Sequence, residues 1–379
     1  MINVLADQYL HNIESYLPKN INLTLFDPND GFPVDISKSH ALLIRTVLPV
    51  NRQSLPKIPE SIEFIGTASA GSDHVDTKYL REHGVTFTNA AGCNARSVAE
   101  YIATALLLWS EARKEKLVNL EVGIVGAGHV GQQVIHLLDQ LDISYRTYDP
   151  PREQRENTFS SVSLTEVLQC DILTFHTPLT KKGDWPTYHW LNNEKLNQHA
   201  FNLVINTSRG GVIDEQALLE AKRKGTIRDI IVDVWEDEPE FNLNTANEAL
   251  IKTPHIAGYS EQAKNNATNI VVNAMLNHFD IQNSNRDVSK NQRTVQQNIS
   301  NFGTFAEVLT ELHPIKKYEH ELEKIIDGNP QKRGPLFNRL RAEYPLRQEF
   351  ANIYLPARYF QEYPLLKKLG FSQARADAK

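Results

Sequence analysis

Three polar side chains have the types needed for acid–base chemistry on a small acid. Arg209 lies in NTSRGGVID (206–214), Glu238 in DVWEDEP (233–239) and His255 in TPHIAG (253–258). A histidine titrates near neutral pH, so it can take a proton from an alcohol while a hydride leaves the same carbon. An arginine binds a carboxylate through its fork of donors, and a carboxylate beside a histidine fixes the tautomer of the ring. These are the groups that a hydride-transferring dehydrogenase needs.

Each of the three also has an ordinary structural alternative. A histidine is often a hydrogen-bonded structural residue, an arginine often forms a surface ion pair, and an acidic stretch is often a solvated loop. The spacing of the three residues along the chain does not show that they meet. The elements around them decide which interpretation holds.

The stretch VGIVGAGHVG at 122–131 is typical of a turn that binds phosphates. It reads as the end of a buried strand, followed by Gly126, Gly128 and Gly131 in G-x-G-x-x-G spacing and by a helical pattern from Val130 to Leu141. The first glycine permits the tight turn, the second lets the backbone approach a pyrophosphate, and the third lets helix and strand pack closely. The helix N-terminus then offers N–H groups and a positive dipole end to an anion.

A second predicted strand adds to the case for a dinucleotide. Residues 145–149 read as a strand that ends in Asp149, 23 positions after Gly126. A carboxylate at about this distance is expected to hold the ribose of NAD. A glycine-rich turn in some other α/β protein is the alternative interpretation.

Other polar residues follow predicted strands. His176 and Thr177 follow residues 172–175, Thr207 and Arg209 follow 203–206, and Asp233 lies at the end of 230–234. Because ligands of such sheets bind beyond the carboxyl ends of the strands, these residues are placed where a site is expected.

The chain as a whole alternates strand and helix patterns, which predicts an α/β fold. Strands are predicted in the first ninety residues at 2–6, 23–26, 41–45, 64–67 and 85–88, with helices at 9–17 and 77–83. Helices are also predicted at 94–113, capped by Asn94, at 215–224 and at 261–279. Residues 282–300, rich in Asn, Gln and Ser, are predicted to be a linker or exposed loop, and the tail from Phe302 a small α/β unit.

Composition excludes some classes of protein. A chain of 379 residues predicts two or three domains, and no apolar run approaches the roughly 18 residues of a membrane helix. The N-terminus lacks the pattern of a secretion signal, and two cysteines are too few for a disulfide framework or a zinc site, so we expect a cytoplasmic protein without a metal.

The net charge of −6 divides into −11 over residues 1–285 and +5 over 286–379. That basic excess is spread among acids, which favours a solvated face or a subunit interface over nucleic-acid binding.

Taken together, these motifs resemble those of the D-isomer-specific 2-hydroxyacid dehydrogenases. The resemblance rests on GIVGAGHVG, NTSRGGVID, DVWEDEP and TPHIAG. It is closer to the branch that oxidises a phosphorylated four-carbon 2-hydroxy acid on the route to pyridoxal 5′-phosphate. The motifs of that branch appear as RTVLPVN (45–51), GTASAGSDHVD (66–76), AAGCNARSVAEY (90–101), DPPR (149–152) and DILTFHTPLT (171–180).

The resemblance implies a role for each matching residue. Arg209 would bind the substrate carboxylate, His255 would be the acid/base, and Glu238 its partner. The substrate would also contact Thr46, Thr67 and Tyr259. NAD would be bound by Gly126, Gly128, His129, Val130, Gly131, Asp149, Thr177, Thr207, Ser208, Arg209, Asp233 and Gly258.

The expected architecture has two doubly wound Rossmann-like lobes with a cleft between them and a small C-terminal α/β dimerisation domain. Residues 1–92 and 259–283 would form the substrate lobe, 93–258 the NAD-binding domain, and 284–379 the domain that forms a homodimer. Two rival functions remain open at this point. One is a related dehydrogenase that acts on phosphoglycerate, hydroxypyruvate or glyoxylate, and the other is an NAD-sensing binding protein on the same fold.

Overall fold

The computed structural model describes residues 1–282, 294–299 and 303–374. The chain divides into two compact units. Unit 1 is Met1–Asn94 with the segment that starts at Ser260, and unit 2 is Ala95–Tyr259 with the segment that starts at Thr294. Most of the predicted linker at 282–300 lies outside the described residues.

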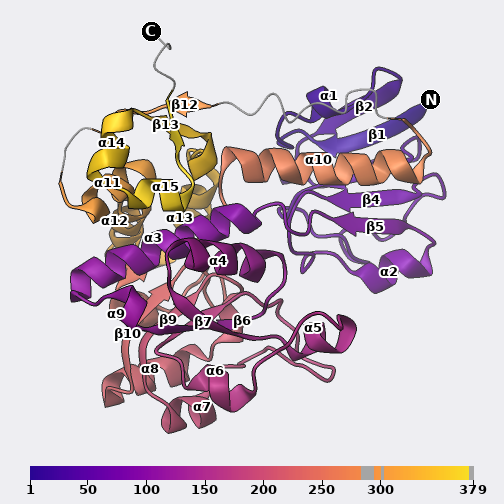
Figure 1. The fold of residues 1–379 in the computed structure, drawn as a ribbon. Helices are drawn as coiled ribbons and strands as arrows, with labels where there is room; N and C mark the ends of the chain where they lie inside the picture. Colours follow the sequence, from indigo (N-terminus) through magenta and orange to yellow (C-terminus); the bar gives the residue numbers. More distant parts are fainter. Residues whose placement is uncertain (283–293, 300–302, 375–379) are drawn as a thin grey trace. The chain divides into compact units, whose positions relative to one another are not determined.

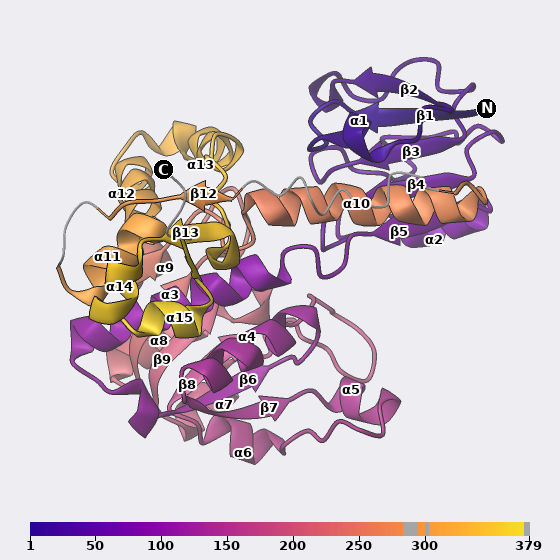
Figure 2. The same ribbon diagram turned by 45° about the horizontal axis from the view of Figure 1, so that its top comes forward.

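Unit 1 is built on a five-stranded parallel sheet with the strand order β2-β1-β3-β4-β5. The strands are β1 (Ile2–Asp7), β2 (Ile21–Phe26), β3 (Ala41–Ile44), β4 (Phe64–Thr67) and β5 (Thr86–Asn89). Helix α10 (Glu261–His278) lies across the sheet beside β4 and β5, as both ribbon views show (Figure 1, Figure 2). Every residue of β3 and β4 is buried, as expected for the inner strands of a sheet covered on both faces.

The short helices of unit 1 show how local polar residues set helix ends. Helix α2 (Thr77–Glu82) begins where the Asp76 side chain accepts the Tyr79 N–H. Helix α1 (Ile13–Tyr16) is shorter than the predicted 9–17, because Asn12 adopts a left-handed conformation with φ of 52° and interrupts the helical path.

Unit 2 contains a six-stranded parallel sheet with the order β11-β10-β9-β8-β6-β7. The strands are β6 (Glu121–Val125), β7 (Ser144–Tyr148), β8 (Ile172–Phe175), β9 (Phe201–Asn206), β10 (Ile227–Val232) and β11 (Ile251–Lys252). The chain runs outward from β6 to β7, then returns to β8 on the other side of β6. This reversal is the topological switch point of a doubly wound sheet, where ligands bind.

Alternate residues of β6 pack against helices on opposite faces of this sheet. Val122 and Ile124 pack with α3 (Ala95–Arg113) and α4 (His129–Gln140), whereas Val125 packs on the other face. That second face is covered by α6 (Leu164–Leu168), α7 (Asn193–Gln198), α8 (Glu215–Lys224) and α9 (Leu243–Glu248). The short helix α5 (Pro150–Arg155) follows β7.

The C-terminal segment is a small α/β arrangement within unit 2. Its three-stranded parallel sheet has the order β12-β13-β14, formed by Val295–Gln296, Ile353–Leu355 and Ser372–Gln373. Its helices are α11 (Phe305–Leu312), α12 (Ile315–Ile326), α13 (Arg333–Ala342), α14 (Ala357–Glu362) and α15 (Leu365–Leu369). Val308, Leu309 and Phe350 share one apolar cluster with Leu106 and Trp109 of α3. The segment therefore packs directly on the helix that precedes the dinucleotide-binding sheet.

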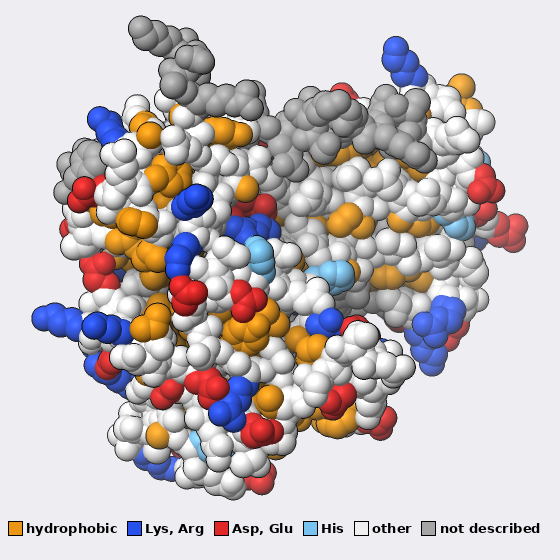
Figure 3. Space-filling view, in the orientation of Figure 1, with side chains coloured by type: hydrophobic (Ala, Val, Ile, Leu, Met, Phe, Trp, Pro, Cys, Tyr) orange, Lys and Arg blue, Asp and Glu red, His pale blue; other side chains and the backbone are white. Residues whose placement is uncertain are grey.

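The predicted fold class, two Rossmann-like sheets with a small third α/β sheet, is confirmed. The predicted cap of α3 is wrong, since the buried Asn94 Oδ1 has no hydrogen-bond partner among the described residues. None of the described helices is long and apolar enough to cross a bilayer. On the face shown in Figure 3, Lys and Arg side chains are interspersed with Asp and Glu.

Candidate active site

The residues expected to bind ligand in unit 2 gather at one edge of its sheet. Gly126 follows β6, Asp149 follows β7, Thr177 follows β8, Thr207 follows β9 and Asp233 follows β10. Because all of these strands are parallel, their carboxyl ends lie at the same edge, next to the switch point between β6 and β8.

The glycine turn has the geometry of a dinucleotide-binding loop. Gly126 adopts φ of 95°, which favours glycine, and a Cβ on Gly131 would collide with the carbonyl oxygen of Gly126. Gly128 is the N-cap of α4, and a Cβ there would meet no protein atom within 4 Å. His129 and Val130 form the first turn of the helix. The open space before this helix N-terminus is where a pyrophosphate would approach the backbone.

The polar groups around this loop fit NAD. Asp149 lies beside the turn, where Oδ2 accepts the Ala127 N–H at 2.8 Å and Oδ1 accepts the Arg152 N–H at 3.0 Å. The buried hydroxyl oxygens of Thr177 and Thr207 have no hydrogen-bond partner among the described residues. Such buried groups usually have partners, so these two are available to a bound cofactor. Ser208, in contrast, donates its hydroxyl to Asn206 at 2.9 Å.

His255 and Glu238 form a close pair. The ring nitrogen Nδ1 of His255 lies 2.7 Å from Glu238 Oε2, and Glu238 Oε1 accepts the Trp235 N–H at 2.8 Å. Burial acts to raise the pKa of Glu238, but His255, Arg341 and the Trp235 bond outweigh it and hold that pKa below its usual value. Since an ionised carboxylate only accepts hydrogen bonds, the His255 Nδ1–H donates to Glu238, and Nε2 is then the ring nitrogen that can accept a proton.

Asp233 holds the turn that carries His255. The backbone at His255 is left-handed, with φ of 58°. Asp233 accepts the Ile256 N–H at 2.8 Å, the Ala257 N–H at 3.0 Å and the Thr253 hydroxyl at 2.6 Å. Burial raises the pKa of Asp233, and His255 and these three bonds act against the rise. In this structure Asp233 therefore positions the histidine turn, in addition to any contact with cofactor.

Arg209 lies on the next loop, in close contact with the loop of Glu238. A Cβ on Gly210 would collide with the Trp235 carbonyl, so only glycine lets the two backbones approach this closely. The Asn206 side chain donates to the Arg209 carbonyl at 2.9 Å, and the Arg209 guanidinium donates to the Ser208 carbonyl at 2.8 Å. These contacts fix the loop at the end of β9.

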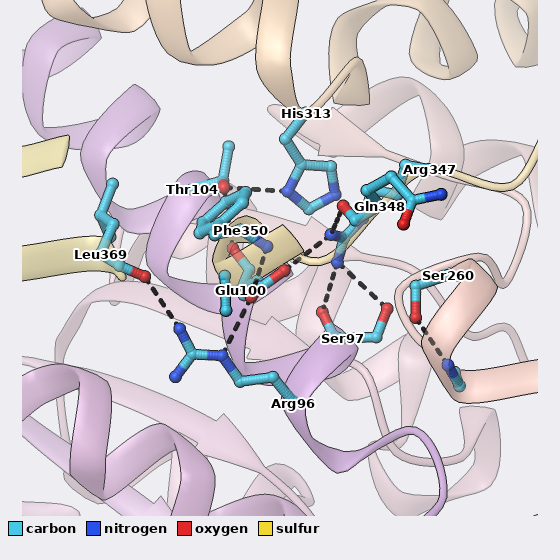
Figure 4. A network of polar contacts seen from close by, with 12 residues as sticks. Arg96, Ser97, Glu100, Thr104, Ser260, His313, Arg347, Gln348, Phe350 and Leu369 are labelled. Atoms are coloured by element: carbon cyan, nitrogen blue, oxygen red, sulfur yellow. Dashed lines mark hydrogen bonds and ion pairs between the residues drawn. The ribbon is translucent and has the colours of Figure 1, made fainter. Parts of the chain in front are cut away.

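The C-terminal segment reaches the histidine turn through helix α3, in the network of Figure 4. Arg347 donates to the backbone carbonyl and the hydroxyl of Ser97 at 3.0 and 3.1 Å. The Ser97 hydroxyl in turn donates to the Ala257 carbonyl at 3.1 Å. Arg347 also pairs with Glu100 at 2.7 Å, and both side chains are almost fully buried. Two hydrogen bonds thus link Arg347 to the turn of His255.

Similarity to known proteins identifies the family to which this chain belongs. Residues 96–257 match the family described as "D-isomer specific 2-hydroxyacid dehydrogenase, NAD binding domain". The chain is 37% identical over 352 residues to the erythronate-4-phosphate dehydrogenase of Bacteroides fragilis, covering 92% of this chain and 97% of that protein. It is 33% identical over 360 residues to the enzyme of the same name from Marinobacter nauticus, covering 92% and 93%. The chain belongs to the erythronate-4-phosphate dehydrogenase family.

Solved structures agree on the fold of this dehydrogenase. A D-lactate dehydrogenase from Aquifex aeolicus, complexed with NAD and lactic acid, matches with a TM-score of 0.59 at 22% identity over 73% of this chain and 95% of that chain. The D-lactate dehydrogenase TP0037 from Treponema pallidum matches with a TM-score of 0.60 at 23% identity, over 75% and 98%. The predictions that the chain is an NAD-dependent 2-hydroxyacid dehydrogenase and that NAD is its cofactor are confirmed.

The predicted substrate contacts of the dehydrogenase lie on both units. Thr46 is an exposed residue just after β3, and Thr67 is the buried last residue of β4. The Thr67 hydroxyl lies 2.9 Å from His74 Nε2 and 3.1 Å from the Ser69 hydroxyl. Tyr259 and Gly258, on unit 2, are half-buried directly after the histidine turn. The roles of all these residues stay predictions.

Two residues near the pair carry no signal in the sequence. Arg341 Nη1 lies 3.6 Å from Glu238 Oε2, and the ring of Tyr344 meets that of Tyr259 edge-on with centroids 5.6 Å apart. Arg341 lies 103 positions after Glu238 and Tyr344 lies 85 positions after Tyr259, in a stretch without a motif. No local pattern in the sequence could have pointed to them.

Proposed function

We propose that this dehydrogenase oxidises the C2 hydroxyl of 4-phosphoerythronate and yields 2-oxo-3-hydroxy-4-phosphobutanoate, on the route to pyridoxal 5′-phosphate. The observation that carries the chemistry is the 2.7 Å pair of His255 and Glu238, on loops that follow strands of the sheet in the NAD-binding domain. The choice of substrate is supported by the names of relatives whose alignments cover 92% of this chain.

The residues divide the work of the reaction. The Arg209 guanidinium binds the substrate carboxylate and orients C2. His255 Nε2 accepts the proton of the C2 hydroxyl, and Glu238 stabilises the imidazolium that forms. The NAD⁺ that the glycine turn would hold would supply the acceptor for the hydride that leaves C2. Thr46, Thr67 and Tyr259 would contact the rest of the substrate.

The test is reduction of NAD⁺ with 4-phosphoerythronate, followed by absorbance, with erythronate and 3-phosphoglycerate as controls. A trap for the carbonyl product is included, because slow release could hide turnover. Only the phosphorylated four-carbon acid should support reduction. Turnover with 3-phosphoglycerate instead would refute the substrate, and NADH binding without any turnover would refute the enzymatic role.

The same assay tests the acid/base. His255→Gln should lower kcat by about 10³-fold, since general acid–base catalysis contributes roughly 10²–10⁴. Quenching of tryptophan emission should show that NADH binding is kept. His320→Gln, at an exposed histidine on α12 that lies 3.7 Å from Glu323, is the matched control and should leave kcat unchanged. A His255→Gln variant with normal turnover contradicts the assignment.

We also propose a cytoplasmic homodimer of subunits with a discontinuous substrate lobe, 1–92 and 259–283, around an NAD-binding domain, 93–258. Residues 284–379 would supply the dimer contacts. The net charge of +5 on the tail beside −11 on the rest of the chain supports an interface there. Light scattering should give twice the 43.0 kDa of one chain, and a monomeric mass would refute the dimer.

A further inference from the structure

Arg341, from the C-terminal segment, lies beside the carboxylate of Glu238. Arg341 Nη1 lies 3.6 Å from Glu238 Oε2, the same oxygen that His255 approaches at 2.7 Å. Three quarters of the Arg341 side chain is buried, and its Nε is buried without a hydrogen-bond partner among the described residues. The guanidinium and the histidine ring therefore both approach the same oxygen of the Glu238 carboxylate.

Aromatic packing fixes the helix of Arg341 against the loop of Glu238. The rings of Trp235 and Phe241, which flank Glu238, have centroids 5.3 Å apart. Phe241 continues to Phe337 of α13 at 5.4 Å, and Arg341 lies over the Phe337 ring with Cζ at 5.9 Å from its centroid. Phe337 is fully buried. Because these ring contacts pack α13 against the loop of Glu238, they fix the position of Arg341 relative to the carboxylate.

A second contact of the segment lies under the histidine turn. Ile256, which follows His255, is buried in a cluster with Tyr318 and Tyr344, and Leu340 packs against them. The end of α13 thus touches both halves of the catalytic pair, the carboxylate through Arg341 and the histidine turn through Leu340 and Tyr344.

We propose that Arg341 is a positioning residue that keeps Glu238 ionised and aimed at His255 during the oxidation proposed above. A full positive charge at 3.6 Å from Oε2 favours the carboxylate over the acid and opposes rotation of the side chain away from the histidine. Burial of Glu238 makes the cation important, because with only the His255 ring and the Trp235 N–H as polar partners the buried carboxylate would protonate more easily.

Other charged and titratable groups lie near the pair, among them Glu236 and Asp237 on the loop of Glu238 and Tyr318 in the cluster under the histidine turn. Asp233 lies close enough to His255 to interact with its charge, and Arg347 and Tyr344 belong to the C-terminal side. Burial raises the pKa of Tyr344 far above neutrality, so this group does not titrate in the range of the assay. Arg347 pairs with Glu100 rather than with Glu238.

The experiment compares Arg341→Met, Arg341→Lys and a matched control in the full-length enzyme. Arg339→Met is that control, because Arg339 lies on the same helix and its side chain pairs, within the part of the chain that the structure describes, with the exposed Glu343. Initial rates with 4-phosphoerythronate and NAD⁺ are measured from pH 4 to 9, and NADH binding is followed by fluorescence. Arg341→Gln serves as a second neutral variant if Arg341→Met does not fold.

The neutral variants should lower kcat about tenfold at pH 7, part of the roughly 10²–10⁴ that general acid–base catalysis supplies. The acidic limb of their kcat profile should move to higher pH, because Glu238 protonates more easily without the cation. KM and NADH binding should stay close to the wild-type values, and Arg341→Lys should recover most of kcat.

Two results overturn the proposal. If the neutral variants behave like Arg339→Met, Arg341 has no part in the reaction. If they raise KM for 4-phosphoerythronate while the acidic limb stays in place, Arg341 binds the substrate phosphate instead. A wild-type enzyme that does not turn over 4-phosphoerythronate refutes the proposed function itself, which is a separate outcome seen before any variant is made.

Discussion

The buried carboxylate of Glu100 offers a sharp test of how the C-terminal segment is held to unit 2. Three donors converge on it: Arg347 Nη1 at 2.7 Å, Arg96 Nε at 2.9 Å and the Phe350 N–H at 3.0 Å. Glu100 itself is fully buried on α3. Arg347 and Phe350 belong to the C-terminal segment, so the substitution Glu100→Gln weakens its attachment without changing the volume of the side chain.

The expected cost follows from the geometry. A glutamine has one acceptor oxygen, so its amide must face at least one of the three donors. Hydrogen bonds to charged groups contribute about 1.5–3 kcal/mol each, and an almost fully buried Arg347 would be left without a counter-charge. Removing one partner of a buried ion pair costs about 3–5 kcal/mol. We expect Glu100→Gln to lower the free energy of unfolding by about that amount.

Tryptophan emission during urea unfolding measures this change in unit 2 alone. All four tryptophans lie between residues 95 and 259, at 109, 185, 190 and 235. Glu321→Gln, which removes an exposed partner of Lys324, is the control and should unfold like the wild type. The double variant Glu100→Leu/Arg347→Met should recover part of the loss, because two apolar groups leave no buried charge. A Glu100→Gln variant as stable as the control would refute the reasoning.

Two further predictions concern the cofactor loop and a thiol. Asp149→Ser should raise kcat/KM for NADP⁺ relative to NAD⁺ by about tenfold, because it removes a negative charge facing the 2′-phosphate; an unchanged ratio from rate measurements with both cofactors would exclude Asp149 from the ribose site. Burial raises the pKa of Cys170 to about 12, so in a Cys93→Ala background Ellman's reagent at pH 8 should react with Cys170 only after denaturant is added, and a rapid reaction in buffer would contradict its burial.

The strands were predictable from the sequence because parallel strands buried on both faces are short continuous apolar runs. Residues 64–67 and 172–175 form strands with the predicted bounds, and the helix predicted at 215–224 is observed at those residues. The glycine spacing also located the turn after β6, since φ of 95° at Gly126 and the close approach at Gly131 leave no alternative residue.

The errors arose where a local pattern competes with a contact elsewhere. The apolar residues at 9–17 predicted a helix, but Asn12 has a left-handed backbone and the helix begins only at Ile13. Asn94 has the right type for a helix cap, yet its side-chain oxygen accepts no hydrogen bond from any described residue. Arg341 and Arg347 are single cations in a tail of mixed charge, and only long-range packing shows that one lies at Glu238 and the other at Ser97 and Glu100.

The C-terminal segment is better understood as a support for the loops of Glu238 and His255 than as an appendage. Its buried polar contacts converge on two places: Arg347 reaches α3 and, through Ser97, the turn of His255, whereas Arg341 reaches Glu238. A segment that served only to join subunits would not need buried ion pairs with these elements of its own chain. The two contacts should also be separable. Glu100→Gln should lower stability and leave the pH profile in place, and Arg341→Met should move the pH profile with little loss of stability. If both variants changed only stability, the segment would support the fold of unit 2 and not its chemistry.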